Sequence, residues 1–252
     1  MGFDVTATAY DRFMGRYSTQ LAPSFRDFIG VRAGGKALDV GSGPGALTAE
    51  LVRSLGPRSV AAVDPSEPFV AAARARFPGV DVRSSFADDL PFPDDAFDAT
   101  AAQLVVHFMR DPIAGIVEMA RVTRRDGVVA ACVWDFAGDR APISAFWRAA
   151  REVDSGVEDE SGLPGARAGQ LSELFQAAGL LRVEEAALVA SVVHASFDDW
   201  WEPFTFGVGP AGAYVRTLAD EELSAIRERC RVLLPDAPFT LTTVAWAARG
   251  HA

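Results

Sequence analysis

The chain has 252 residues, of which 49% are hydrophobic and 23% charged, and its formal net charge is −10. This composition is typical of a globular protein with a sizeable core, and no apolar run approaches the roughly 20 residues that span a bilayer. The negative charge disfavours contact with phosphate backbones, so we expect neither a nucleic-acid partner nor a membrane partner.

The first two thirds of the chain show a regular alternation of predicted elements. Residues 8–30 are expected to be helical. The strands that follow are predicted at 36–40, 59–63, 80–83, 99–103 and 128–134, and the helices between them at 46–55, 67–77 and 112–122. Such alternation is typical of a doubly wound, mostly parallel sheet with helices on both faces. The apolar strand "VVAACVW" fits a sheet that is covered on both sides.

The pattern becomes irregular after Trp134. Helices are predicted at 143–153, 171–178 and 220–233, and long strands at 183–193 and 240–247 complete the sheet as an antiparallel pair. We find no internal repeat and no linker, so we predict a single domain over residues 1–252. Its α/β core covers about 31–135, and a cap is built from about 1–30, 136–170 and 195–238.

The segment "ALDVGSGPG", residues 37–45, is a strand that runs into a glycine turn. Gly41, Gly43 and Ala46 satisfy the G-x-G-x-x-A pattern of dinucleotide sites, and Asp64 lies 23 residues after Gly41, where a ribose-binding acid is expected. Asp39 argues against that interpretation, because a fixed carboxylate repels a diphosphate. A cationic nucleoside resolves the conflict: S-adenosylmethionine carries an ammonium and a sulfonium group, which a buried carboxylate stabilises.

Four segments, in order and at matching spacing, resemble the class I S-adenosylmethionine-dependent methyltransferases, in particular the ubiquinone-biosynthesis-like or type 11 group. They are "ALDVGSGPGALT" (37–48), "VDPS" (63–66), "ADDLPFPDDAFDAT" (87–100) and "EMARVTRRDGVV" (118–129). The resemblance covers about residues 35–135 and implies a Rossmann-like fold with a seven-stranded sheet. It also implies S-adenosylmethionine as cofactor and S-adenosylhomocysteine as product. The helix "YDRFMGRYS" (10–18) is similar to one that closes over the cofactor, which implies a contact from Arg16 or Tyr17.

This chain departs from the family at the adenine-binding stretch. The family usually has Gly-Asp-Ala where this chain has Ser85-Phe86-Ala87, so Phe86 is expected to pack on the adenine ring or turn inward, with Asp88 taking over the polar contact. The family's "KPGG" turn is "RRDG" (124–127) here. The complete set of predicted cofactor contacts is Tyr17, Asp39, Gly41, Ser42, Gly43, Gly45, Asp64, Pro65, Phe86, Ala87, Asp88 and Gln103.

The acceptor site is harder to predict, because methyl transfer from a sulfonium needs positioning more than a particular side chain. His107 follows the strand at 99–103 and is a weak candidate for a general base, with a packing role as the alternative. Aromatic residues of the expected cap could either form a core or line an apolar pocket. The predicted acceptor contacts are His107, Phe108, Trp147, Trp200, Trp201 and Phe204. Glu158–Glu160 are interpreted as part of a solvated loop.

The sequence therefore predicts a cytoplasmic enzyme that methylates a small, apolar or aromatic molecule and acts as a monomer or homodimer. No metal is expected, since the histidines and cysteines are scattered. Two alternatives stay open. An NAD-dependent oxidoreductase would fit the glycine turn, although the single lysine, Lys36, leaves no Tyr-x-x-x-Lys pair. A non-catalytic, cofactor-binding regulatory protein of the same fold would also fit.

Overall fold

The computed structural model describes residues 5–252, so the first four residues of the predicted cap segment 1–30 lie outside the described part. The strands are β1 Ala37–Val40, β2 Val60–Asp64, β3 Asp81–Ser84, β4 Phe97–Gln103, β5 Thr123–Trp134, β6 Leu181–His194 and β7 Phe239–His251. The longer helices are α2 Arg16–Ile29, α3 Ala46–Leu55, α4 Glu67–Arg76, α5 Pro112–Val122, α6 Ser144–Val153, α7 Gln170–Ala177 and α10 Asp220–Leu233.

The shorter helical elements lie mainly near the ends of these elements. They are α1 Ala7–Tyr10, the π-helical turn η1 Asp11–Gly15, α8 Phe197–Trp201, α9 Gly209–Val215 and the 3₁₀ turns η2 Pro57–Ser59, η3 Val106–Phe108, η4 Glu160–Gly162 and η5 Glu202–Phe206. Almost every predicted element is present, with boundaries that differ by a few residues. None of the helices within residues 5–252 has the length and apolar character that crossing a membrane requires.

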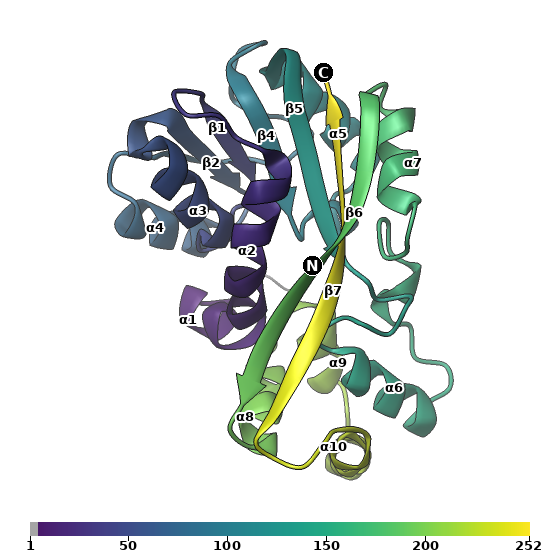
Figure 1. Cartoon of the computed structure of the whole chain (residues 1–252). Coiled ribbons are helices and arrows are strands. Elements are labelled where there is room, and N and C mark those ends of the chain that lie inside the picture. Colours follow the sequence, from purple (N-terminus) through teal and green to yellow (C-terminus); the bar gives the residue numbers. More distant parts are fainter. Residues whose placement is uncertain (1–4) are drawn as a thin grey trace.

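The seven strands form one sheet in the order β3-β2-β1-β4-β5-β7-β6. Strands β1 to β5 are parallel, and β7 is antiparallel to both of its neighbours. Figure 1 shows α2 and α3 in front of the sheet and α5 behind it. The strands β1 and β2 are buried along their whole length, which is why all their residues except Asp39 and Asp64 are small or branched apolar ones. This is the predicted doubly wound, mostly parallel architecture.

The segment "RRDG" is part of β5 rather than a separate turn before it. The register between β4 and β5 jumps from the Phe97–Thr123 pair to the Ala99–Val128 pair, so the extra residues bulge out of the ladder. Asp126 within this bulge has φ 60°, in the left-handed region. The expected change of direction therefore occurs inside a longer strand, as a bulge.

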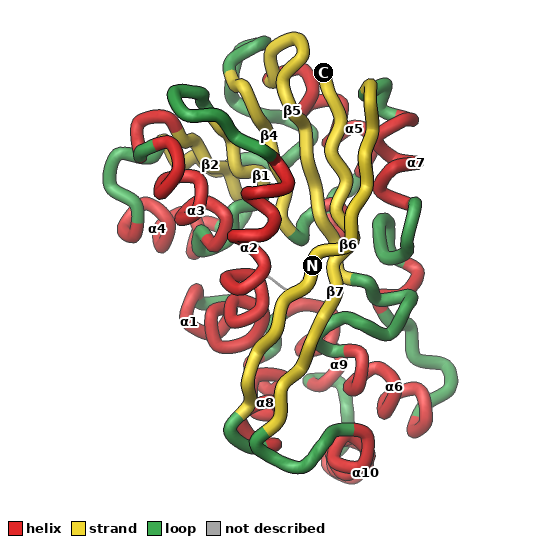
Figure 2. Tube along the Cα trace, in the orientation of Figure 1, coloured by secondary structure: helices red, strands yellow, loops and turns green. Residues whose placement is uncertain are grey.

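The two last strands extend beyond the rest of the sheet and carry the cap. β5 ends at Trp134, opposite Ala245, whereas β6 and β7 stay paired as far as His194 and Phe239. Figure 2 shows this two-stranded ribbon running past the sheet to α8 and α10. Residues 195–238, which form α8, η5, α9 and α10, are inserted between the two strands. The sequence order thus places the cap beside the carboxyl ends of the parallel strands.

The N-terminal helices connect the core to the cap by polar contacts. The guanidinium of Arg16 donates to both carboxylate oxygens of Asp199, each at 3.0 Å, and to the carbonyl of Val193 at 3.1 Å. The Tyr17 hydroxyl lies 2.7 Å from Nε2 of the buried His194. A planar fork of donors matches a carboxylate well, so these contacts hold α2 against the start of α8.

Candidate functional site

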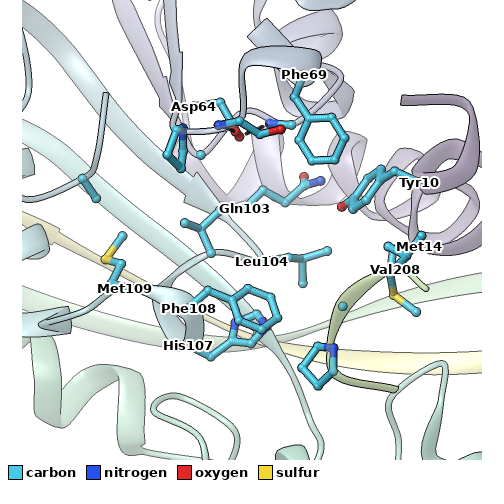
Figure 3. Close-up of a pocket in the computed structure, with 18 of the residues that line it drawn as sticks. Tyr10, Met14, Asp64, Phe69, Gln103, Leu104, His107, Phe108, Met109 and Val208 are labelled. Atoms are coloured by element: carbon cyan, nitrogen blue, oxygen red, sulfur yellow. Dashed lines mark hydrogen bonds between the residues drawn. The ribbon is translucent and has the colours of Figure 1, made fainter. Parts of the chain in front are cut away.

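A cavity of about 700 Å³ opens between the carboxyl ends of the parallel strands and the cap. Such an edge of a doubly wound sheet is where ligands of this fold class bind. Asp64 and Phe69 lie toward one end of the cavity, and His107 and Val208 lie toward the other (Figure 3). Its volume lies within the range of about 300–1,000 Å³ that is usual for small-molecule sites.

The glycine turn after β1 forms part of the cavity wall, and at Gly41 there is no room for a side chain. Gly41 has φ 68°, and a Cβ on it would lie 2.5 Å from Cγ2 of Val105. Gly43 has φ 53° and open space in front of it. Both glycines line the cavity, as predicted for cofactor contacts. Gly45 lines neither described cavity; its φ is 103° and it packs closely on Phe77, so its role is in the turn itself.

Asp64, at the end of β2, is held by two backbone donors. Its Oδ2 accepts from the amide of Gly43 and its Oδ1 from the amide of Ser66, both at 2.8 Å. The residue is 6% exposed and lines the cavity. Burial raises the pKa of this carboxyl, although the two backbone hydrogen bonds oppose the shift. A carboxylate offers about four acceptor positions, so about two remain for a ligand such as a ribose.

Asp39 is completely buried behind the glycine turn, where it lines a second, small cavity of about 30 Å³. Its Oδ2 accepts from the Thr48 hydroxyl at 2.6 Å, while its Oδ1 has no hydrogen-bond partner within residues 5–252. Burial raises the pKa of this carboxyl to about 7, against the effect of the Thr48 hydrogen bond. A buried acceptor without a donor is costly, and a cationic ligand close by would lower that cost.

Gln103, at the carboxyl end of β4, borders both cavities and, like Asp39, has a buried oxygen without a hydrogen-bond donor. Its Nε2 donates to the Ser18 carbonyl at 3.1 Å, which fixes the orientation of the amide. Its Oε1 is buried and has no partner in the described part of the chain. The side chain therefore presents an unsatisfied acceptor beside the glycine turn.

The predicted adenine-binding stretch borders the same cavity. Pro65, Phe86, Ala87 and Asp88 all line it. Phe86 is 46% exposed, and the guanidinium of Arg110 lies 4.0 Å from the centre of its ring. The expectation that Phe86 turns inward is therefore wrong; its ring lies at the rim, where a flat ligand could stack.

The N-terminal helices contribute to the site through a different residue than expected. Tyr10 and Met14 line the cavity, and the ring of Tyr10 packs edge-on against Phe69 with centroids 5.3 Å apart. Tyr17 is two helical turns further along and instead contacts His194. Arg16 and Tyr17 therefore lie at the junction with the cap and are not among the lining residues, although the Tyr17 ring packs edge-on against the lining residue Trp134. A contact from Arg16 or Tyr17 to the cofactor stays a prediction, whereas Tyr10 and Met14 are residues of these helices that line the cavity.

His107 and Phe108 follow β4 and line the cavity as predicted. His107 is 5% exposed, and its Nδ1 has no hydrogen-bond partner among the described residues. Burial lowers its pKa to about 3, so the imidazole is neutral at physiological pH. Leu104, between β4 and these residues, has φ 63° and also lines the cavity. Left-handed backbone at a non-glycine residue is often found at functional sites.

The four aromatic residues predicted to contact the acceptor do not line the cavity. Trp147, Trp200, Trp201 and Phe204 are buried against one another and against Phe146. The Phe146 and Phe204 rings are stacked with centroids 4.7 Å apart. This cluster is the core of the cap, because the inserted segments need apolar surface of their own to bury.

Several lining residues could not be identified from the sequence. The apolar ones are Phe13, Val105, Met109, Trp134, Ile143, Val208 and Ala211. Glu160 is an unexpected polar one: it is 4% exposed and lines the cavity, which corrects its interpretation as a residue of a solvated loop. Its neighbour Glu158 is exposed, and nothing in the acidic stretch distinguishes the two. In residues 5–252, no group of three or more His, Cys, Asp or Glu side chains is arranged to hold a metal ion.

Comparisons with known proteins agree with this geometry. Residues 38–131 match the family model described as a methyltransferase domain. The chain is 34% identical over 147 residues to phosphatidylethanolamine N-methyltransferase of Cereibacter sphaeroides, covering 56% of this chain and 70% of that protein. It is 37% identical over 113 residues to demethylmenaquinone methyltransferase of Mycobacterium sp. (strain JLS), covering 45% of this chain and 47% of that protein.

The fold itself recurs in solved structures. Geranyl diphosphate C-methyltransferase of Streptomyces coelicolor A3(2), solved with Mg²⁺, geranyl diphosphate and S-adenosylhomocysteine, superposes with a TM-score of 0.55 at 14% identity, covering 92% of this chain and 77% of that one. The matched region spans 27% of a curated methyltransferase of Oryza sativa subsp. japonica, and 70% and 47% of the two relatives named above. With its core motifs, strand order and relatives in agreement, this chain belongs to the class I S-adenosylmethionine-dependent methyltransferases.

Proposed function

We propose that this protein transfers a methyl group from S-adenosylmethionine to a small, mostly apolar acceptor in the cytoplasm. The observation that carries the proposal is the continuity of one cavity of about 700 Å³, which joins the acid after β2 to the apolar wall under the cap. A methyl transferase needs both compartments in one space, because the methyl group and its acceptor must meet in line.

The residues present fit S-adenosylmethionine better than a dinucleotide. Asp64 has acceptor capacity to spare for two ribose hydroxyls. Asp39 and Gln103 present buried oxygens without donors beside the glycine turn, which suits an ammonium or sulfonium group and would oppose a diphosphate. When bound, the cofactor supplies an electrophilic methyl group on a positively charged sulfur.

The remainder of the cavity suits an apolar acceptor. Phe136, Ile143 and Val208 line its wall, and His107 adds a ring that burial keeps neutral. A neutral imidazole can accept a proton but adds no positive charge to the site. We therefore assign the chain's main contribution to orientation and water exclusion, with His107 as the weaker candidate for a base.

Two measurements test this function. Isothermal titration should detect binding of S-adenosylhomocysteine and no comparable binding of NAD. Incubation with methyl-labelled S-adenosylmethionine and a panel of phenols, hydroquinones and amines should transfer label to at least one acceptor. Binding of NAD alone would favour the oxidoreductase alternative, although the sole lysine, Lys36, directly precedes β1 at the opposite end of that strand from the glycine turn. Cofactor binding without transfer to any acceptor would favour a non-catalytic protein.

A further inference from the structure

Glu160 is a buried acid that lines the cavity. The other acids that line the cavity lie at or after the carboxyl ends of the parallel strands: Asp64 ends β2, Glu67 begins α4, and Asp88 and Asp111 lie in the segments after β3 and β4. Glu160 instead comes from η4, in the segment between β5 and β6, and is only 4% exposed. No basic side chain within residues 5–252 forms an ion pair with it. A carboxyl in such a place loses hydration without gaining a counter-charge.

The carboxyl group is held in place by α6. The indole Nε1 of Trp147 donates to Oε2 of Glu160 at 2.8 Å. One helical turn later, Arg151 forms an ion pair with Asp159, the residue directly before Glu160. Two successive turns of α6 therefore hold the successive residues Asp159 and Glu160. The position of the Glu160 side chain is fixed by these contacts.

The second carboxyl oxygen is the one available to a ligand. No hydrogen bond to Oε1 is found in the described part of the chain, whereas Oε2 is used by Trp147. Burial raises the pKa of this carboxyl to about 7, against the effect of the indole hydrogen bond, so its charge is sensitive to whatever enters the cavity. A donor group on a bound molecule would supply the hydrogen bond that the protein does not.

We propose that Glu160 is the acceptor-recognition residue of this site, its free oxygen accepting a hydrogen bond from an O–H or N–H group on an otherwise apolar acceptor. The inference rests on the proposed function and narrows it. The acceptors are phenol-like or amine-like molecules, and ethers, hydrocarbons and fully oxidised quinones bind less well because they bring no donor. The aromatic lining around Phe136 and His107 suits the ring of such an acceptor.

The substitution Glu160→Gln tests this polarity directly. The Trp147 N–H can still donate to the amide oxygen of glutamine, which turns the amide nitrogen, a donor, toward the position of Oε1. Binding of 2-naphthol, 2-naphthylamine and 2-methoxynaphthalene is measured by fluorescence on protein saturated with S-adenosylhomocysteine. At about pH 8, where a carboxyl with a pKa of about 7 is mostly ionised, the wild type should bind 2-naphthol or 2-naphthylamine at least about tenfold more tightly than 2-methoxynaphthalene, the effect of one hydrogen bond to a charged group.

In the E160Q variant this preference should disappear or reverse, while the matched control E158Q, an exposed acid of the same segment, should behave as the wild type does. Tighter binding of the naphthol assigns a phenol-like acceptor, and tighter binding of the amine an amine-like one. A wild type that binds the three probes equally or not at all, or an E160Q variant that keeps the preference, overturns the inference. The wild-type comparison needs no substitution, so it decides even if E160Q fails to fold. Failure of S-adenosylhomocysteine to bind would instead overturn the proposed function.

Discussion

Replacement of Asp64 by alanine should weaken the binding of S-adenosylhomocysteine by about 1.5–3 kcal/mol, the value of a hydrogen bond to a charged group. In the structure each oxygen of this carboxylate accepts one backbone amide at 2.8 Å, from Gly43 and Ser66. About two acceptor positions remain for ribose hydroxyls. The expected loss corresponds to an increase in Kd of about 10- to 150-fold, since 1.4 kcal/mol is a factor of ten.

Isothermal titration at a temperature well below Tm measures this change. Because Asp64→Ala also removes the partners of two backbone amides, the turn itself loses support and Tm should fall. Asp64→Asn keeps the shape and one acceptor oxygen, and therefore separates loss of charge from collapse of the turn. The matched control is Glu67→Gln, which removes an exposed acid of the same cavity wall and should change Kd by less than about twofold. Unchanged Kd values in both Asp64 variants would show that this residue does not bind the ribose.

Three further predictions concern the turn, the buried acid and the cap. Gly41→Ala should lower the free energy of unfolding, measured by chemical denaturation, by about 2 kcal/mol or more, because φ is 68° and the new Cβ would lie 2.5 Å from a Val105 carbon. Gly43→Ala places its Cβ in open space and should cost about 1 kcal/mol. Equal losses in the two variants would contradict the role of the close contact. Burial raises the pKa of Asp39 to about 7, so this carboxyl is mostly protonated at pH 6 and mostly ionised at pH 8. The affinity for the S-adenosylmethionine cation should therefore rise by up to about tenfold from pH 6 to pH 8. In Asp39→Asn, titrations at the two pH values should give the same affinity. Asp199→Asn should lower the free energy of unfolding by only about 1 kcal/mol, because the ion pair between Asp199 and Arg16 is partly exposed. A wild-type Tm that did not change with salt concentration would argue against an ionic attachment of the cap.

The positions of the core elements follow closely from local sequence patterns. The helix predicted at 112–122 and the helix predicted at 220–233 begin and end where expected, because proline and acidic residues at the start and apolar spacing along the helix are local signals. The seven-stranded sheet was implied by the family resemblance, and the long β6–β7 pair was correctly expected to be antiparallel. The residues at the strand ends, including Asp64 and Gln103, were therefore brought together as predicted.

The sequence by itself determined which backbone turn could form a ligand site. Glycine at positions 41 and 43 permits φ above zero, and the carboxylates at 39 and 64 led to the prediction of a cationic ligand. Both properties depend on residues adjacent in the chain or at the ends of neighbouring strands, so short-range chemistry is sufficient to recognise them.

Tertiary structure alone decided which side chains of the cap enter the cavity. Trp200 and Glu160 illustrate the reason: an aromatic residue in an inserted segment satisfies the hydrophobic effect equally well in a cap core or a pocket wall, and an acid in a polar loop gives no local sign of burial. The choice depends on the docking of α6, α8 and α10 around the extended strands, which involves residues far apart in the chain. Tyr17 differs from Tyr10 for the same reason, since two turns along one helix separate the cavity from the junction with the cap.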